Sequence, residues 1–206
     1  MKYLTIVAGL LCGSMWLAGC SCNPSPTGNG AATGSASTST NTNPHGGGSG
    51  KPATQNDIDR FLAKKPSVTN PSPLVGQGAN FQSSGQEYEV DPRFIVAIMA
   101  AETTYGTAKC HSTPVVQTHN AWNWFWCESN DTCGSDVCVH SPFDTWGSGI
   151  QTVSHFMRKN YINKGYTSVS LIASKYCTEG CGNWVPNVTA SLQEMNGNPE
   201  NLELKQ

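Results

Sequence analysis

Apolar positions between residues 88 and 106 follow the spacing of one face of an α-helix. The positions on that face are Ile95, Ile98, Met99 and Glu102. Asp91 is a favourable N-cap and Pro92 suits the first helical position, so the helix is expected to begin there. Gly106 supplies a stop signal. The apolar stripe therefore ends in a carboxylate, Glu102, near the C-terminus of the predicted helix.

This position favours the protonated form of Glu102. Burial disfavours the charged carboxylate, and the negative end of the helix dipole disfavours it further. Both effects raise the pKa of Glu102, as a general acid that works near neutral pH requires. The alternative is an ordinary glutamate of the last helical turn, which reaches water or pairs with Lys109.

Most of the chain after residue 54 shows helical spacing as well. The first segments are a short helix capped by Asn56 or Asp57 and stopped at Pro66, and a weaker helix over 81–88. The later segments are a helix over 146–161, a short helix that Thr167 or Ser168 starts and that carries Val169, Ile172 and Tyr176, and a last helix from Pro186 to Gly197. The expected fold class is therefore mostly α (α+β), with a small β or irregular lobe.

One segment between the helices alternates instead. Trp122, Trp124 and Trp126 occupy every second position, which predicts a short strand. Three tryptophans on one side form either a surface on which sugar rings stack or a small aromatic core. Both alternatives stay open, because indole faces pack against pyranose rings as well as against apolar side chains.

The N-terminal third of the chain has the features of an exported protein. A positively charged start precedes an apolar run that is too short for a transmembrane helix and ends in Leu-Ala-Gly-Cys at Cys20. This ending resembles the bacterial lipobox, so residues 1–20 are predicted to be a lipoprotein signal peptide, with Cys20 lipidated. Residues 21–53 lack large apolar side chains and are predicted to be a flexible Gly/Ser/Thr/Asn-rich tether. Residues 54–206 are the predicted domain.

Composition narrows the class of function. Charged residues make up 13% of the 206 residues and the formal net charge is −2, so nothing suggests a nucleic-acid partner. Low charge together with nine cysteines suits an exported protein.

Six cysteines remain in the predicted domain: Cys110, Cys127, Cys133, Cys138, Cys177 and Cys181. An even number in an oxidising compartment predicts disulfides. Pairing of nearest neighbours would join the first to the second, the third to the fourth and the fifth to the sixth.

Two other interpretations use some of the same cysteines. Cys127, Cys133, Cys138 and His140 could form a zinc site, although their spacing is not a familiar zinc pattern. The Cys110–His111 pair could belong to a thiol hydrolase, which needs a reactive thiolate and a histidine close in space. Export favours disulfides over both, and no metal or cofactor is expected.

A resemblance to a known family is carried by residues 72–107, SPLVGQGANFQSSGQEYEVDPRFIVAIMAAETTYGT. This segment resembles the core of the lysozyme-like glucosaminidase family, peptidoglycan hydrolases related to the mannosyl-glycoprotein endo-β-N-acetylglucosaminidase-type domain. In that family the glutamate that closes this helix is the catalytic acid, which implies that role for Glu102. The resemblance extends diffusely over residues 56–197 and implies a lysozyme-like fold, with a helical lobe that carries Glu102 and a small disulfide-rich lobe.

The same resemblance implies residues that line the cleft. Asn120 and Asn123 loosely match an Asn-x-x-Asn segment of the family, and Tyr176 falls where a family tyrosine contacts the substrate near the scissile bond. The alternative for Tyr176 is a buried core tyrosine. The residues expected to contact substrate are Tyr105, Asn120, Trp122, Asn123, Trp124 and Tyr176.

The implied reaction is hydrolysis of a β-1,4 bond in peptidoglycan glycan strands, after N-acetylglucosamine. The enzyme would be a monomer, held in the cell envelope on the exported face of a bacterial membrane by a lipid at Cys20. The candidates for a second catalytic carboxylate are Glu128, Asp131, Asp136 and Asp144. Glu128 is preferred because it follows the tryptophan segment, but an acetamido group of the substrate could act instead.

Two other functions stay open at this point. One is an enzyme of the muramidase or lytic transglycosylase type, which cuts on the muramic acid side. The other is a catalytically inactive module that binds the cell wall without turnover.

Overall fold

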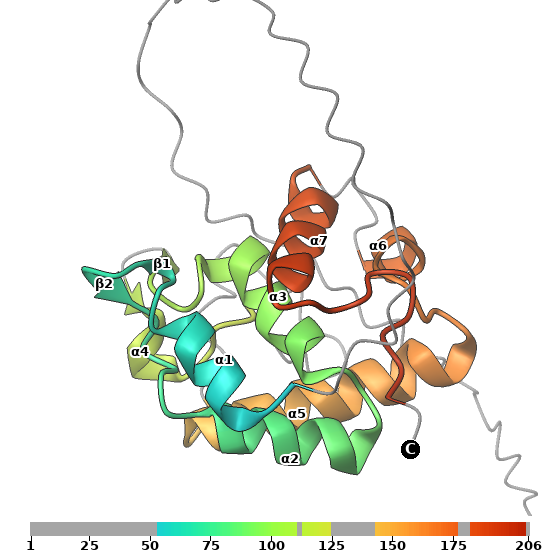
Figure 1. Cartoon of the computed structure of the whole chain (residues 1–206), viewed down its shortest axis with the longest axis horizontal. Helices are drawn as coiled ribbons and strands as arrows, with labels where there is room; N and C mark the ends of the chain where they lie inside the picture. The colour runs from blue at the N-terminus through green and yellow to red at the C-terminus, as the bar shows by residue number, and fades with distance from the viewer. Residues whose placement is uncertain (1–52, 111–112, 125–142, 177–181, 205–206) are drawn as a thin grey trace, which may run out of the picture.

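The computed structural model describes residues 53–110, 113–124, 143–176 and 182–204. Its helices are α1 (Gln55–Leu62), α2 (Gly78–Tyr88), α3 (Pro92–Thr103), α4 (Val115–Thr118), α5 (Trp146–Asn160), the 3-10 helix η2 (Ile162–Lys164), α6 (Val169–Tyr176) and α7 (Trp184–Glu194). The strands pair as two short antiparallel hairpins, β1 (Pro66–Ser67) with β2 (Asn70–Pro71) and β3 (Lys109–Cys110) with β4 (Thr113–Pro114). The mostly α architecture is confirmed (Figure 1). None of the helices in these ranges is long and apolar enough to cross a membrane.

Several predicted features lie outside the described residues. They are the signal peptide with Cys20, the tether, Trp126, Glu128, Asp131, Asp136, His111, His140, Cys127, Cys133, Cys138, Cys177 and Cys181. The backbone of Cys110 is described but its side chain is not. The disulfide-rich lobe and its pairing therefore stay predictions.

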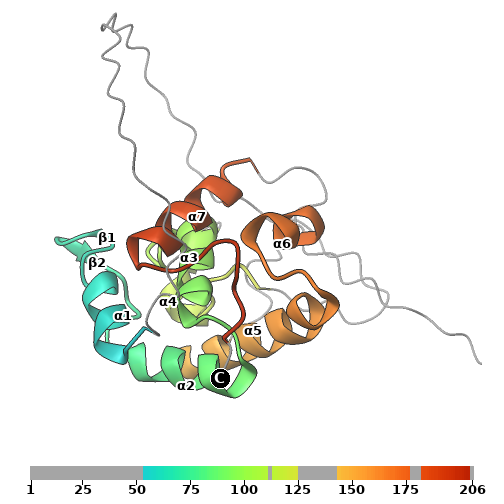
Figure 2. The ribbon, with the colours of Figure 1, turned by 45° about the vertical axis from the view of Figure 1, so that its right-hand side comes forward.

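Helix α3 forms the centre of the fold, with α7 above it and α5 below it in Figure 2. It begins where the sequence predicts, with Asp91 as N-cap and Pro92 in the first turn. The Asp91 carboxylate accepts a hydrogen bond from the Arg93 N–H at 2.9 Å and forms a buried ion pair with its guanidinium at 2.7 Å. Arg93 also donates to the carbonyl of Asn196, which ties the start of α3 to the segment that follows α7.

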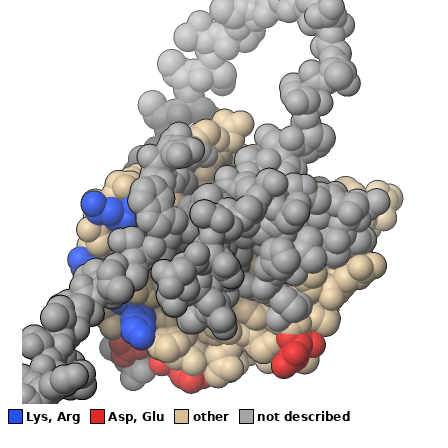
Figure 3. Space-filling model, turned by 180° about the vertical axis from the view of Figure 1, so that it is seen from behind, with Lys and Arg blue, Asp and Glu red and all other residues tan. Residues whose placement is uncertain are grey.

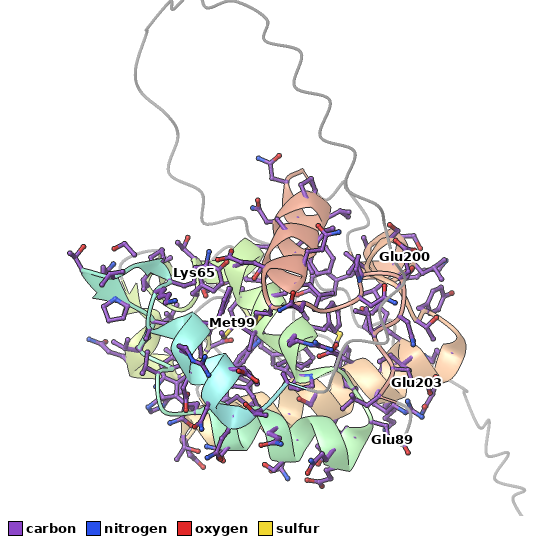
Figure 4. The ribbon with its side chains drawn as sticks, viewed as in Figure 1. Lys65, Glu89, Met99, Glu200 and Glu203 are labelled. Atoms are coloured by element: carbon purple, nitrogen blue, oxygen red, sulfur yellow. The ribbon has the colours of Figure 1, made fainter. Side chains whose placement is uncertain are left out.

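The predicted apolar face of α3 is buried. Its members, including Met99 near the middle of the helix in Figure 4, are at most 5% exposed. The rest of the helix is buried almost as fully, because α2, α5 and α7 all pack against it. The helix ends at Thr103, earlier than the glycine signal suggested, and Thr104, Tyr105 and Gly106 all have positive φ angles.

The N-cap of α1 differs from the prediction. Thr54 is the cap, and its side chain accepts a hydrogen bond from the Asp57 N–H while the Asp57 carboxylate accepts one from the Thr54 N–H. Asp57 is thus the third helical residue of a capping box rather than the cap itself. Helix α2 begins at Gly78, before the predicted 81–88 segment. A Cβ at Gly78 would lie 2.2 Å from the carbonyl oxygen of Gln55, so only glycine allows α1 and α2 to approach this closely.

The predicted helices of the second half are confirmed, with one shift. Helix α7 begins at Trp184 and Pro186 is its third residue, a position where the missing N–H leaves no helical hydrogen bond unmade. Arg158 of α5 joins two segments at one end of the bundle through ion pairs with Glu89 at 2.8 Å and Glu203 at 2.9 Å (Figure 4). Viewed from behind, the visible charged side chains of the described residues lie toward the edges of the surface, with Asp and Glu along the bottom (Figure 3).

The predicted strand over the tryptophan segment is wrong in its described part. Residues 119–124 form turns, and His119 and Asn123 have φ angles of 51° and 48°, which no strand allows. Side-chain bonds hold this turn, since the Asn120 carboxamide accepts from the Trp124 N–H at 2.8 Å and donates to the Trp124 carbonyl at 2.5 Å.

Candidate active site

Four segments that are distant in the sequence meet at the carboxylate of Glu102. Oε1 accepts hydrogen bonds from the Tyr176 hydroxyl at 3.1 Å and from the Trp184 indole N–H at 3.0 Å. Oε2 accepts one from the Asn123 carboxamide at 3.3 Å, and the same nitrogen donates to the Glu102 carbonyl at 3.0 Å. These donors come from the end of α6, the start of α7 and the 119–124 turn, and they surround the last turn of α3.

Burial sets the protonation of this carboxyl. Glu102 is 5% exposed, which excludes the ordinary solvent-facing glutamate that the sequence left open. Burial raises the pKa of Glu102 to about 7, against the opposite effect of the hydrogen bonds from Tyr176, Trp184 and Asn123. The raised pKa expected from the sequence is therefore present, and burial is its main cause.

Tyr176 stays a neutral donor at ordinary pH. Burial, and then the charge of Glu102 and the hydrogen bond to it, raise the pKa of the Tyr176 phenol well above its usual value. Its ring lies 5.1 Å from the Trp184 indole, centroid to centroid, so the two donors to Oε1 also pack against each other.

The two oxygens of the Glu102 carboxylate differ in the hydrogen bonds that they accept. Oε1 already accepts from two donors, whereas Oε2 accepts from one at a longer distance. A proton on Oε1 would have to replace one of the two shorter bonds. A hydrogen on Oε2 leaves both shorter bonds to Oε1 in place.

Local structure in the two turns fixes Asn123 and Glu102 relative to each other. The Thr103 hydroxyl donates to the Ala121 carbonyl at 2.6 Å and accepts from the Gly106 N–H at 3.0 Å. This residue connects the end of α3 to the turn that carries Asn123. Asparagine tolerates the left-handed backbone at this position, which a β-branched residue would resist.

Trp122 and Trp124 belong to the core. Trp122 is 1% exposed and its indole N–H donates to the Ile95 carbonyl at 2.9 Å. Trp124 is 3% exposed and packs edge-on against Phe156 at 4.5 Å. Both residues were expected to contact substrate, and the structure corrects that expectation to the aromatic-core alternative, because a buried indole has no free face for a sugar. Asn120 is likewise buried and serves to hold the turn.

Tyr105 and Asp144 form no hydrogen bond with the Glu102 carboxylate in the described part of the chain. The Tyr105 hydroxyl and the Ser191 hydroxyl are hydrogen-bonded at 3.2 Å, and the Tyr105 ring lies edge-on to Phe61 at 5.7 Å. Asp144 is exposed just before α5. Neither residue is among the hydrogen-bond partners of Glu102, and the preferred second carboxylate, Glu128, lies outside the described residues.

Trp184 is the site residue that the sequence did not single out. Its neighbours in the chain carry no catalytic motif, and it reaches Glu102 only because α7 packs along α3. Within the described ranges, no three His, Cys, Asp or Glu side chains come together in a way that could hold a metal ion.

The chain was compared with family models, curated proteins and solved structures, and only solved structures match it. No family model and no curated protein matches the sequence. A crystal structure of S. aureus autolysin E in complex with the muropeptide NAM-L-Ala-D-iGlu matches with a TM-score of 0.47 and 12% identity over 75% of this chain and 72% of that chain. A catalytic mutant of the same autolysin in complex with the disaccharide NAG-NAM matches with a TM-score of 0.49 and 11% identity over 75% of this chain and 73% of that chain. Because both TM-scores lie below 0.5, the function of this chain has to be inferred from the geometry around Glu102.

Proposed function

We propose that the protein hydrolyses β-1,4 glycosidic bonds in peptidoglycan glycan strands, with Glu102 as the general acid. One observation carries this proposal: a buried carboxyl with a pKa of about 7, whose Oε1 is held by Tyr176 and Trp184. A general acid has to be protonated at the working pH and yet able to release its proton, and a pKa near that pH meets both demands.

The proton transfer follows from the roles of the two oxygens. As the bond between the anomeric carbon and the glycosidic oxygen breaks, the proton of Oε2 passes to that oxygen, which leaves as a hydroxyl. The negative charge that remains on Glu102 is stabilised by the hydrogen bonds from Tyr176, Trp184 and Asn123. Water then supplies the hydroxyl group of the new reducing end, and its remaining proton restores the acid form of Glu102.

The substrate class rests on the sequence. Residues 72–107 resemble the glucosaminidase family around the same glutamate, and the exported character of the chain suits a substrate in the cell wall. The bond after N-acetylglucosamine is the one that this family cleaves. A lipid at Cys20 and a tether over residues 21–53 would hold the domain on the membrane, within reach of the wall.

The second catalytic group has two candidates. Glu128 could act as base or nucleophile, in line with the paired carboxylates of most glycosidases. The acetamido oxygen of the substrate could instead attack the anomeric carbon, and then no second carboxylate would be needed. The anomeric configuration of the first product shows whether the reaction retains or inverts the configuration at the anomeric carbon. The activity of Glu128→Gln shows whether the second catalytic group is this carboxylate or the acetamido group of the substrate.

The deciding experiment is digestion of purified peptidoglycan by Glu102→Gln. Glutamine keeps the volume, and its one oxygen can accept the bonds from Tyr176 and Trp184, but it cannot donate a proton to the leaving oxygen, so cleavage should fall by about 10²–10⁴-fold. Glu200→Gln, an exposed glutamate in the same domain, is the matched control and should cleave like the parent. A folded Glu102→Gln that cleaves at the parental rate would rule out this role.

The products distinguish the other functions. A new reducing end on N-acetylglucosamine is expected, whereas one on muramic acid would indicate a muramidase and an anhydro end a lytic transglycosylase. Glycan binding without any new end from the parent protein would indicate an inactive wall-binding module.

A further inference from the structure

A cavity lies between α2 and α5, and neither Glu102 nor any of its hydrogen-bond donors lines it. Its volume is about 720 Å³, and its lining includes Asn80, Ser84 and Glu87 of α2 and Trp146 and Gln151 of α5. In Figures 1 and 2 these two helices run along the lower side of the bundle, whereas α6 and α7, which supply the donors to Glu102, lie on the upper side. We propose that this groove is a second saccharide-binding site, which takes a neutral N-acetylated sugar of a glycan strand.

The groove is built for a polar ligand. The Asn80 carboxamide donates to the Gln77 carboxamide at 2.7 Å, and within the described residues this leaves the Asn80 Oδ1 and the Gln77 Nε2 without a hydrogen bond. Ser84 is 5% exposed, lines the groove, and its hydroxyl also has no hydrogen-bond partner in the described part of the chain. Ser84 Oγ is not among the fully buried polar atoms that lack a partner, so this hydroxyl reaches the groove and is open to a hydrogen bond with a ligand or water.

An aromatic pair lies at the other wall of the groove. The rings of His119 and Trp146 meet edge-to-face at 5.1 Å, and both residues line the cavity. His119 Nδ1 lies 2.9 Å from the Phe143 carbonyl, so Nδ1 carries a hydrogen and Nε2 of the neutral ring is an acceptor. Indole next to carboxamides and hydroxyls suits a sugar, which has apolar ring faces and polar edges.

Charge decides which polar ligand fits. Glu87 is the single Asp, Glu, Lys or Arg side chain among the described lining residues, so no Lys or Arg there would neutralise an anion. Carboxylates of a stem peptide, or phosphates, would meet repulsion from Glu87 without a compensating Lys or Arg. A neutral sugar with hydroxyl and acetamido groups avoids this repulsion, and the volume lies within the usual range of ligand pockets. The choice of an acetamido sugar among neutral sugars rests on the function proposed above.

A groove that shares no lining residue with the Glu102 site would act on polymer rather than on short fragments. A long strand, or a neighbouring strand of the same wall, held in the groove would stay close to Glu102 after each cleavage, which raises its effective concentration at the catalytic site. Loss of the groove should therefore slow digestion of insoluble peptidoglycan and leave cleavage of a short soluble substrate at the parental rate.

Two tryptophans make the sites separately observable. Trp184 contacts Glu102, Trp146 lines the groove, and the full chain has six tryptophans in total. The measurement is NMR of the full chain that carries Glu102→Gln and tryptophan labelled with ¹⁵N in the indole. The trimer of β-1,4-linked N-acetylglucosamine should shift the indole signals of both Trp146 and Trp184. The signals are assigned with Trp146→Phe and Trp184→Phe.

Groove variants test the assignment. Asn80→Ala with Ser84→Ala should weaken the response of Trp146 about 10-fold or more, since two polar partners are lost, and leave the response of Trp184 unchanged. The matched control is Gln86→Ala with Asn56→Ala, which removes exposed polar groups outside the groove. Because Asn80 is exposed, Asn80→Ala should fold, and this single variant replaces the double variant if the latter does not fold.

Any one of three results would overturn the second site. The first is a Trp146 signal that does not shift at trimer concentrations that saturate Trp184 or reach the solubility limit. The second is a response of the groove variants equal to that of the control, and the third is a stem peptide that shifts the Trp146 signal when the trimer does not. A response of Trp146 without one of Trp184 would support the groove and count against the proposed function, so the two inferences fail separately.

Discussion

The indole N–H of Trp184 donates to Oε1 of Glu102 at 3.0 Å, although the two residues are 82 positions apart in the chain. The bond favours the charged carboxylate, whereas burial of Glu102 favours the neutral acid, and burial has the larger effect. The pKa of about 7 is thus a balance between two opposing effects, and each can be changed by one substitution.

Replacement of Trp184 by phenylalanine should raise the pKa of Glu102 further. Phenylalanine keeps most of the apolar burial but removes a donor that stabilises the carboxylate. Because the acid form is the active one, the alkaline limb of kcat/KM should move to higher pH, by up to about one pH unit for the loss of one hydrogen bond. The measurement is the pH–rate profile on a soluble glycan substrate.

Tyr105→Phe is the control for this shift, because Tyr105 bonds Ser191 and not the Glu102 carboxylate. Its alkaline limb should coincide with that of the parent. A Trp184→Phe limb that moves to lower pH would show that the indole does not stabilise the charged form.

Glu102 should also make the folded protein less stable at alkaline pH. The pKa of Glu102 in the folded protein is about 7, above the 4.5 of a free glutamate, so the folded state binds the proton more tightly. The stability that this proton contributes is fully present below pH 4.5 and is lost as the pH rises through 7. The loss amounts to about 3 kcal/mol when the difference between the two pKa values is converted to free energy.

Glu102→Gln has no such proton to lose. Urea unfolding at pH 5 and pH 8 should show that the parent loses more of its free energy of unfolding than this variant between the two values. Glu200→Gln, which removes an exposed glutamate, should follow the parent. Equal pH dependence of all three proteins would mean that Glu102 ionises like a free side chain.

Features of the fold that depend on neighbouring residues could be predicted from the sequence, whereas contacts between distant segments could not. Helix α3 and its buried face follow from Asp91, Pro92 and the apolar spacing, because caps and periodicity act within a few residues. Local patterns do not give the distant donors to Glu102, because Tyr176 and Trp184 are 74 and 82 positions away and reach it only through packing of α6 and α7. Tyr176 was named as a site residue only through the family resemblance.

The tryptophan segment shows why a pattern can mislead. Alternation predicted a strand, but the positive φ angles of His119 and Asn123 turn the chain, and the Asn120 carboxamide bonds both backbone groups of Trp124. Side-chain bonds to nearby backbone groups compete with strand pairing, and hydrophobicity patterns do not register them.

Cys20 should determine where the protein resides. The Leu-Ala-Gly-Cys ending of the apolar run predicts lipidation, and the lipid would hold the domain on the membrane. Expression of Cys20→Ser in a bacterial host should abolish labelling by a fatty-acid analogue and either release the domain or leave the precursor unprocessed. Cys22→Ser is the control, since Cys22 lies in the predicted tether and its loss should change neither labelling nor processing. Labelling of Cys20→Ser at the parental level would refute the anchor.

Thr104 should be a site of stored backbone strain next to the catalytic carboxyl. It caps α3 with φ 52° and ψ 54°, a left-handed conformation in which a β-branched residue is unfavourable. Asparagine adopts this conformation more readily, so Thr104→Asn should raise the free energy of unfolding by about 1 kcal/mol. Thr152→Asn in the middle of α5 is the control and should not stabilise, because that position is helical. Since Thr104 lies two residues after Glu102, glycan cleavage by Thr104→Asn shows whether the strained geometry matters for catalysis. If urea unfolding finds Thr104→Asn no more stable than Thr152→Asn, the cap of α3 is not strained.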